Sequence, residues 1–192
     1  MKKLLVFVLC SSLLLVSCQT YQANRLAEQG YEHMQSQNFD ASSVLFAKAS
    51  TKDAKNHTYR YNYLLSLFLQ GHYDEVIVQS EEAFETFPFN LSFLLIQAQS
   101  YAEKQEYEKA LVTYNRLFKL DPASYETQAS VMEQALLWKE YETAKDLALG
   151  LVNQKAYEKK ALGVLSEIAG DDTWYALALA YVTKEKQSQS QQ

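Results

Sequence analysis

The chain has 192 residues, of which 48% are hydrophobic and 21% are charged, with only 5 Gly and 2 Pro. This composition excludes a chain that is disordered over most of its length, and the scarcity of turn-forming residues favours helices over many short strands. Two Cys exclude a disulfide scaffold, and a formal charge of -5 with a pI of about 5.3 argues against the basic face that nucleic-acid binding requires.

Residues 1–17 have the order of a secretory signal peptide. Lys2 and Lys3 precede a mostly apolar run over residues 4–16. A membrane-spanning helix needs about 20 apolar residues, so this run is too short to remain in the membrane as a spanning segment. We therefore predict that the chain is exported and that residues 1–17 are removed.

The apolar run ends in Leu15-Val16-Ser17-Cys18. This motif resembles the lipobox of bacterial lipoproteins, in which the cysteine is diacylated on sulfur before cleavage. The resemblance implies that Cys18 becomes the first mature residue and carries the lipid (palmitate-type) anchor, with residues 18–22 as the lipidated Cys and a short linker. The alternative is cleavage elsewhere, which leaves Cys18 as an ordinary thiol. Gln19, in place of Asp after the cysteine, fits sorting to the outer membrane of the cell envelope, facing the periplasm.

A period of 34 residues organises most of the remaining chain. It is carried by a column of aromatic residues, by a column of small or β-branched residues three positions later, and by a column of Ala or Leu seven positions after that. The columns are Phe39, Tyr73, Tyr107 and Tyr141; Ser42, Val76, Ala110 and Ala144; and Ala49, Ala83, Leu117 and Leu151. The phase holds without a gap, which indicates four copies of one supersecondary unit.

The repeat resembles the tetratricopeptide repeat, whose 34-residue unit folds as two antiparallel helices. The third unit carries the family pattern best, in Leu94, Ala98, Tyr101, Tyr107, Ala110, Tyr114 and Pro122. The resemblance implies an all-α fold, a right-handed superhelical stack of antiparallel helix hairpins, with units over residues 23–56, 57–90, 91–124 and 125–158. It also implies that each aromatic of the first column starts a second helix. Small residues such as Gly30 and Ala98 then let the two helices of a unit approach closely.

The phase breaks after residue 158. The following sequence predicts an aberrant pair of capping helices over residues 159–184, because an array of repeats must cover its last apolar face. Trp174 and Tyr181 repeat the first-helix pattern in the second of these helices. The alternative is that this face is a docking surface for a partner. Residues 185–192 are polar and predict a disordered tail.

The first helices of a tetratricopeptide stack line a concave groove that accepts an extended peptide or a partner helix. By that resemblance, Tyr31, Tyr61 and Leu65 form an aromatic and aliphatic wall of the groove, and Asn62 and Gln99 are available to bond a peptide backbone. By the same resemblance, positions 2, 5, 9 and 12 of each unit line the groove, and none of these sixteen positions holds Lys or Arg, which disfavours a clamp for a terminal carboxylate. The sixteen residues are Asn24, Ala27, Tyr31, Met34, Thr58, Tyr61, Leu65, Phe68, Ser92, Leu95, Gln99, Ala102, Glu126, Ala129, Glu133 and Leu136. The alternative for the aromatic members is simple packing against adjacent first helices.

The sequence carries no catalytic constellation. His33, His57 and His72 lack the spacing of a metal site, and the chain has neither a Gly-rich phosphate loop nor a nucleophile motif. We therefore expect no enzymatic activity, no bound metal and no cofactor.

Together these features predict a membrane-anchored lipoprotein that acts as a protein–protein interaction scaffold in an envelope assembly complex. The expected partners are proteins bound in the groove and the membrane reached through the lipid anchor, with no nucleic acid. The alternative is an accessory subunit that holds a small apolar ligand for a transporter, because a neutral, Tyr-rich lining also suits such a molecule.

Overall fold

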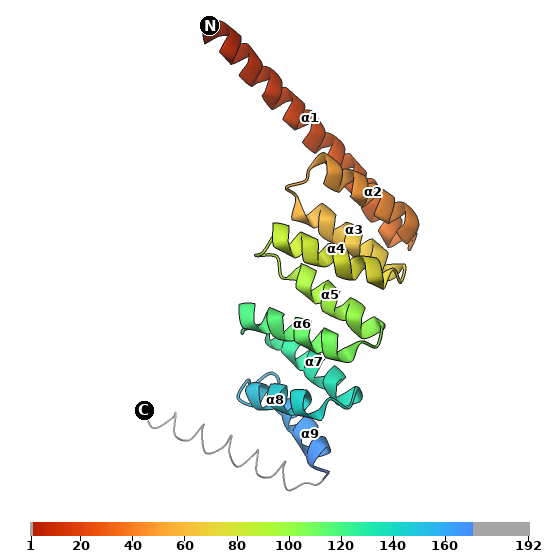
Figure 1. The fold of residues 1–192 in the computed structure, drawn as a ribbon, viewed down its shortest axis with the longest axis vertical. Coiled ribbons are helices and arrows are strands. Elements are labelled where there is room, and N and C mark those ends of the chain that lie inside the picture. The colour runs from red at the N-terminus through yellow and green to blue at the C-terminus, as the bar shows by residue number, and fades with distance from the viewer. Residues whose placement is uncertain (1, 171–192) are drawn as a thin grey trace. The chain divides into compact units, whose positions relative to one another are not determined.

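A computed structural model describes the backbone of residues 2–170 and the side chains of residues 19–170. This part of the chain folds into nine α-helices and contains no strand, which confirms the all-α prediction for these residues (Figure 1). The helices are α1 (Lys2–Gln35), α2 (Phe39–Lys52), α3 (His57–Leu69), α4 (Tyr73–Thr86), α5 (Ser92–Glu103), α6 (Tyr107–Leu120), α7 (Tyr125–Leu137), α8 (Tyr141–Leu151) and α9 (Glu158–Ala169).

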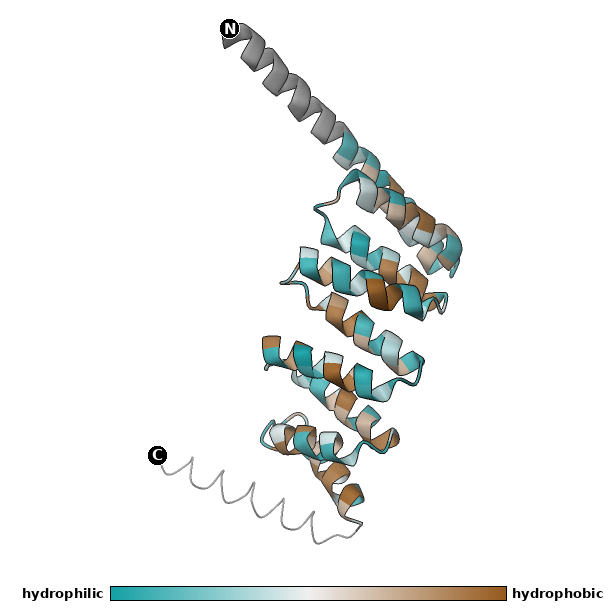
Figure 2. Cartoon of the chain, in the orientation of Figure 1, coloured by the Kyte–Doolittle hydropathy of each residue, from teal (hydrophilic) through white to brown (hydrophobic). Residues whose placement is uncertain are grey.

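The chain divides into two compact units, Met1–Leu117 and Phe118–Gln192. In the first unit, α1 packs on α2, α2 packs on α3, and α4 packs on both α3 and α5. In the second unit, α7 packs on α8, and α9 packs on both of them. Along α6 hydrophobic and hydrophilic residues alternate, as expected for a helix with one buried face (Figure 2). Each unit is therefore built from helices that cover one another's apolar faces.

The 34-residue period reappears in the helix boundaries. The second helix of each pair begins at the aromatic residue that marks the period, at Phe39, Tyr73, Tyr107 and Tyr141. The prediction that these aromatics start the second helices is confirmed.

The turns inside the four helix pairs are the same motif. The residue two positions before each second helix has a positive φ, at Gln37 (59°), Gly71 (81°), Gln105 (60°) and Lys139 (65°). At each turn this residue's amide bonds to the carbonyl three positions back, and the next amide bonds five positions back, as from His72 N to Leu67 O at 3.0 Å. This is the Schellman arrangement, which satisfies carbonyls at the end of the first helix. Only one of these four residues is Gly, so the residue types in the sequence do not reveal that the four turns share one conformation.

Asparagine side chains accept hydrogen bonds from backbone amides at the starts of three helices. Asn38 Oδ1 accepts from the Ala41 amide at the start of α2, at 3.3 Å. Asn56 and Asn90, which lie one period apart, accept from the second residue after them at 3.0 and 3.2 Å. These bonds satisfy amide groups that a helix start leaves without a partner.

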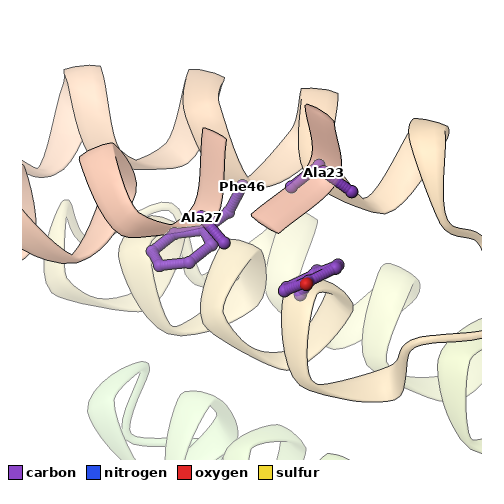
Figure 3. Packing of buried hydrophobic residues seen from close by; sticks show 5 residues of the cluster. Ala23, Ala27 and Phe46 are labelled. Atoms are coloured by element: carbon purple, nitrogen blue, oxygen red, sulfur yellow. The ribbon is translucent and has the colours of Figure 1, made fainter. Parts of the chain in front are cut away.

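Small residues and two aromatic rings form a core where α1, α2 and α3 meet. Its buried residues are Ala23, Ala27, Phe46, Ala49 and Tyr59, and Figure 3 shows the Phe46 ring beside Ala27. Gly30 lies against the same ring, because a Cβ built on Gly30 would stand 3.0 Å from Phe46 Cε2. Gly30 therefore provides the close approach of the two helices that its position in the repeat predicts.

Several predictions concern the ends of the chain. The residues expected as a linker, 18–22, have a helical backbone within α1. After residue 158 the structure contains α9, which ends at Gly170 with a φ of 69°. Residues 171–192 lie outside the described residues, together with the predicted docking residues Trp174 and Tyr181, and so does the Cys18 side chain. Among the helices that were described, none combines the length and apolarity needed to cross a membrane.

Candidate binding face of the first helices

The groove residues predicted from the sequence lie on the first helices of three repeats, all within the compact unit Met1–Leu117. Tyr31 is on α1, Tyr61, Asn62 and Leu65 are on α3, and Gln99 is on α5. We call this set the first-helix face. Tyr31, Leu65 and Gln99 are separated by one period each, so they occupy the same position of three successive units. Side chains at equivalent positions of a repeat form a row across its helices.

The members of the first-helix face differ in exposure. Tyr31 is 39% exposed, Gln99 is exposed, and Tyr61 and Leu65 are half-buried, whereas Asn62 is only 7% exposed. Gln99 makes no side-chain hydrogen bond within the described part of the chain, so its amide group is free to bond a partner's backbone. Tyr31 and Gln99 are therefore the most exposed members of the first-helix face.

Tyr31 is held in place from beneath. Asn62 Nδ2 donates a hydrogen bond to Tyr31 Oη at 2.6 Å, and the Tyr31 ring meets Phe46 edge-on with centroids 4.9 Å apart. The ring therefore loses little rotational freedom when a partner covers its exposed side. Asn62 was predicted to bond a peptide backbone. In the structure Asn62 is buried, and its side-chain amide instead holds Tyr31 in place.

Tyr61 packs against the neighbouring first helix. Its ring meets Phe93 of α5 edge-on, with centroids 6.2 Å apart. Burial raises the pKa of the Tyr61 hydroxyl, so this group remains a neutral hydrogen-bond donor at physiological pH. Tyr61 therefore packs between two first helices, and its half-buried side chain leaves part of its surface on the first-helix face.

A second Tyr–Asn pair joins the same two helices. The Tyr59 hydroxyl of α3 donates a hydrogen bond to Asn24 Oδ1 of α1. With the bond between Tyr31 and Asn62, each helix contributes one Tyr and one Asn to the junction of α1 and α3. The sequence shows these residues, but their pairing depends on how two helices more than 20 residues apart in the chain are packed.

The described residues contain no group of three or more His, Cys, Asp and Glu side chains able to hold a metal ion. Of the three histidines, His57 is engaged through its Nδ1 with Asn90 Nδ2, at 3.0 Å. This contact joins the start of α3 to the loop before α5, where the imidazole serves the packing of that loop.

Helix hairpins that recur every 34 residues, joined by turns of one type, define this chain as a helical-repeat protein. Solved structures give the class a name. The chain resembles a tetratricopeptide repeat protein from Parabacteroides merdae with a TM-score of 0.67 and 19% identity, over 86% of this chain and 67% of that one. It also resembles MamA of MSR-1 with a TM-score of 0.57 and 13% identity, over 88% of this chain and 97% of that one.

The TPR domain of Arabidopsis OM64 matches with a TM-score of 0.50 and 14% identity, over 55% of this chain and 87% of that domain. No protein-family model matches the chain, and no curated protein sequence matches it. At these identities the likeness concerns the fold alone. The chain has the fold of the tetratricopeptide repeats, as the 34-residue period predicts.

Proposed function

We propose that this chain is a non-enzymatic, membrane-anchored scaffold that binds a protein partner on the first-helix face. The observation that carries the proposal is Tyr31, a half-exposed aromatic residue fixed by Asn62 and Phe46 and aligned with Leu65 and Gln99. Preordered aromatic residues with an exposed side are typical anchors of protein interfaces. The tetratricopeptide fold supports protein binding as a class of function.

The chemistry of the first-helix face favours a neutral or apolar segment of the partner. The sixteen groove positions contain no Lys or Arg, so a terminal carboxylate would find no cation there. Tyr31 and Leu65 offer apolar contact, while Gln99 can both donate to and accept from a peptide backbone. An amphipathic helix or an extended peptide that presents apolar side chains meets these requirements.

Membrane attachment through Cys18 is the second part of the proposal. It is supported by the order of residues 1–18, with two lysines, an apolar run and the lipobox-like Leu15-Val16-Ser17-Cys18. We propose that the mature chain lies on the periplasmic side of the outer membrane and serves an envelope assembly complex there. Metabolic labelling with a palmitate analogue should label the chain and should not label Cys18→Ser. Equal labelling of the two would remove the anchor from the proposal.

Photo-crosslinking in living cells tests the partner site. A photoreactive residue at Gln99 or Leu65 should give a discrete protein adduct after detergent extraction. The matched control is Val78, which is 60% exposed on the second helix α4. Adducts from Val78 in place of the first-helix positions, or adducts from a probe at Tyr181 alone, would move the binding surface elsewhere.

A substitution measures how much Tyr31 contributes. Truncating a central aromatic anchor typically costs about 2 kcal/mol or more, which corresponds to roughly 30-fold in affinity. We expect Tyr31→Ala to reduce the yield of the Gln99 adduct strongly. Val78→Ala should leave that yield unchanged.

A further inference from the structure

A hollow of about 670 Å³ lies on the surface of the first helix pair, between the early described turns of α1 and the end of α2. Its volume falls within the range of small-molecule sites. It is separate from the first-helix face and contains none of its residues. The lining includes Tyr21, Arg25, Leu26, Gln29, Lys48 and Lys52.

Three cations line this hollow, and no carboxylate of residues 19–170 does. Arg25, Lys48 and Lys52 have no Asp or Glu within ion-pair distance among the described residues. Other cations of the chain do have such partners, as Arg116 has in Glu81 at 2.8 Å and Lys104 has in Asp74 at 2.6 Å. Three neighbouring positive charges repel one another, and a bound anion would offset that repulsion.

The end of α2 accounts for only one of these charges. Lys52 lies in the last turn of α2, where a cation interacts favourably with the helix dipole. Lys48 lies one turn earlier, and Arg25 comes from the other helix, so the dipole explains neither. Lys48 and Lys52 are four residues apart and therefore share a face of α2, turned toward the same hollow as Arg25.

The hollow also has an amphipathic wall. Tyr21 is 64% exposed, and Leu26 is half-buried beside it. The first coloured turn of α1, next to the grey segment, is mostly hydrophilic (Figure 2). Tyrosine beside Lys and Arg is the composition found where proteins meet the headgroups of a bilayer.

The position along α1 places this hollow near the proposed anchor. Arg25 follows Cys18 by seven residues, and a helix rises 1.5 Å per residue, so about 10 Å separate them along the axis. Because α2 returns alongside α1, its last two turns bring Lys48 and Lys52 back to the same end of the pair. A lipid on Cys18 would hold all three cations at the level of the headgroups.

We propose that this basic hollow binds the phosphate of an anionic phospholipid headgroup. The choice of a lipid as ligand rests on the proposed membrane anchor, whereas the cation cluster itself does not. The guanidinium of Arg25 and the two ammonium groups bond the phosphate oxygens. Tyr21 and Leu26 contact the glycerol and the first methylenes of the acyl chains. The acidic protein body thereby gains a specific contact with a negatively charged leaflet.

The test uses the full chain in micelles of a non-ionic detergent, titrated with phosphatidylglycerol and followed by native mass spectrometry. We expect tighter retention of phosphatidylglycerol than of phosphatidylcholine. The variant Arg25→Gln/Lys48→Gln/Lys52→Gln should lose roughly a hundredfold in affinity, since each cation near an anionic surface is worth about fivefold. The control Lys119→Gln/Lys155→Gln/Lys159→Gln removes the same charge from exposed lysines without ion pairs and should bind as the unchanged chain does.

Four results would overturn the inference. They are equal retention of the two lipids, retention of phosphatidylglycerol by the Arg25/Lys48/Lys52 variant, an equal loss in the control variant, and displacement of phosphatidylglycerol by millimolar inorganic phosphate. The last result would identify a site for free phosphate. The substituted side chains are all exposed, so both variants should keep the far-UV circular dichroism of the unchanged chain.

This measurement is independent of the proposed scaffold role. Binding in micelles requires neither an acyl group on Cys18 nor a protein partner. If crosslinking or palmitate labelling fails while phosphatidylglycerol is retained, the proposed function falls and the lipid site stands. If the lipid is not retained while crosslinking succeeds, the opposite holds.

Discussion

The repeated turn between paired helices gives a prediction whose sign depends on one backbone angle. Gly71 and Gln105 occupy the same turn position in two successive repeats of the compact unit Met1–Leu117, with φ of 81° and 60°. A side chain in this left-handed region costs about 1–2 kcal/mol, and Gly avoids that cost. Gly in turn loses about 0.5–1 kcal/mol more conformational entropy on folding.

The two contributions give opposite expectations for exchanges at the two turns. Gly71→Ala should destabilise the chain by about 1 kcal/mol, and Gln105→Gly should stabilise it by about 0.5–1 kcal/mol. A Cβ at Gly71 would meet no atom within 4 Å, so the loss is conformational and involves no steric clash. Each kcal/mol corresponds to about 2–4 °C in the melting temperature of a chain of this size.

Urea unfolding of the full chain, followed by far-UV circular dichroism, measures both free energies. The control is Gly163→Ala in the middle of α9, where φ is not positive and a Cβ likewise meets no atom within 4 Å. There the same exchange should stabilise by about 0.5–1 kcal/mol, because Ala is the better helix former. A neutral or stabilising Gly71→Ala, or a destabilising Gly163→Ala, would refute the reasoning from the turn geometry.

Three further substitutions test packing, the first-helix face and ionisation. Gly30→Ala places a Cβ 3.0 Å from the Phe46 ring and should destabilise by about 1–2 kcal/mol in thermal unfolding, and the added change Phe46→Leu should make the pair non-additive. Tyr31→Phe leaves the buried Asn62 amide without its acceptor and should cost about 1–2 kcal/mol, a loss that should largely vanish in a background of Asn62→Leu. Burial raises the pKa of Tyr114 to about 12, above its ordinary value of 10.0, so its contribution is fully present below pH 10 and is lost as the pH rises toward 12. Tyr114→Phe should therefore flatten the alkaline decline of stability in a pH series of urea titrations, and an unchanged slope would count against the burial of this hydroxyl.

Helix α1 links the two proposed surfaces. Its early turns contribute Arg25 to the basic hollow, and its later turns contribute Tyr31 to the first-helix face. Both residues are exposed, on a helix whose buried residues Ala23 and Ala27 face the core. A lipid contact and a partner contact can therefore be altered separately by substitutions on one helix.

The sequence by itself determined the repeat. Aromatic residues at a period of 34 mark the starts of the second helices, at Phe39, Tyr73, Tyr107 and Tyr141. The small residue Gly30 likewise marks a close approach that holds in the structure. Periodicity of this kind is local information, since each unit repeats the requirements of the one before it.

The tertiary structure alone decided which side chains of separate helices meet. The bond between Tyr31 and Asn62 joins residues 31 positions apart, and the basic hollow combines Arg25 with Lys48 and Lys52 from an antiparallel helix. The left-handed conformation of Gln105 also could not be predicted from the sequence, because glutamine gives no signal of a positive φ. Such features depend on which helix faces come together in space, and the free energy of those contacts is set by packing between segments that no local pattern records.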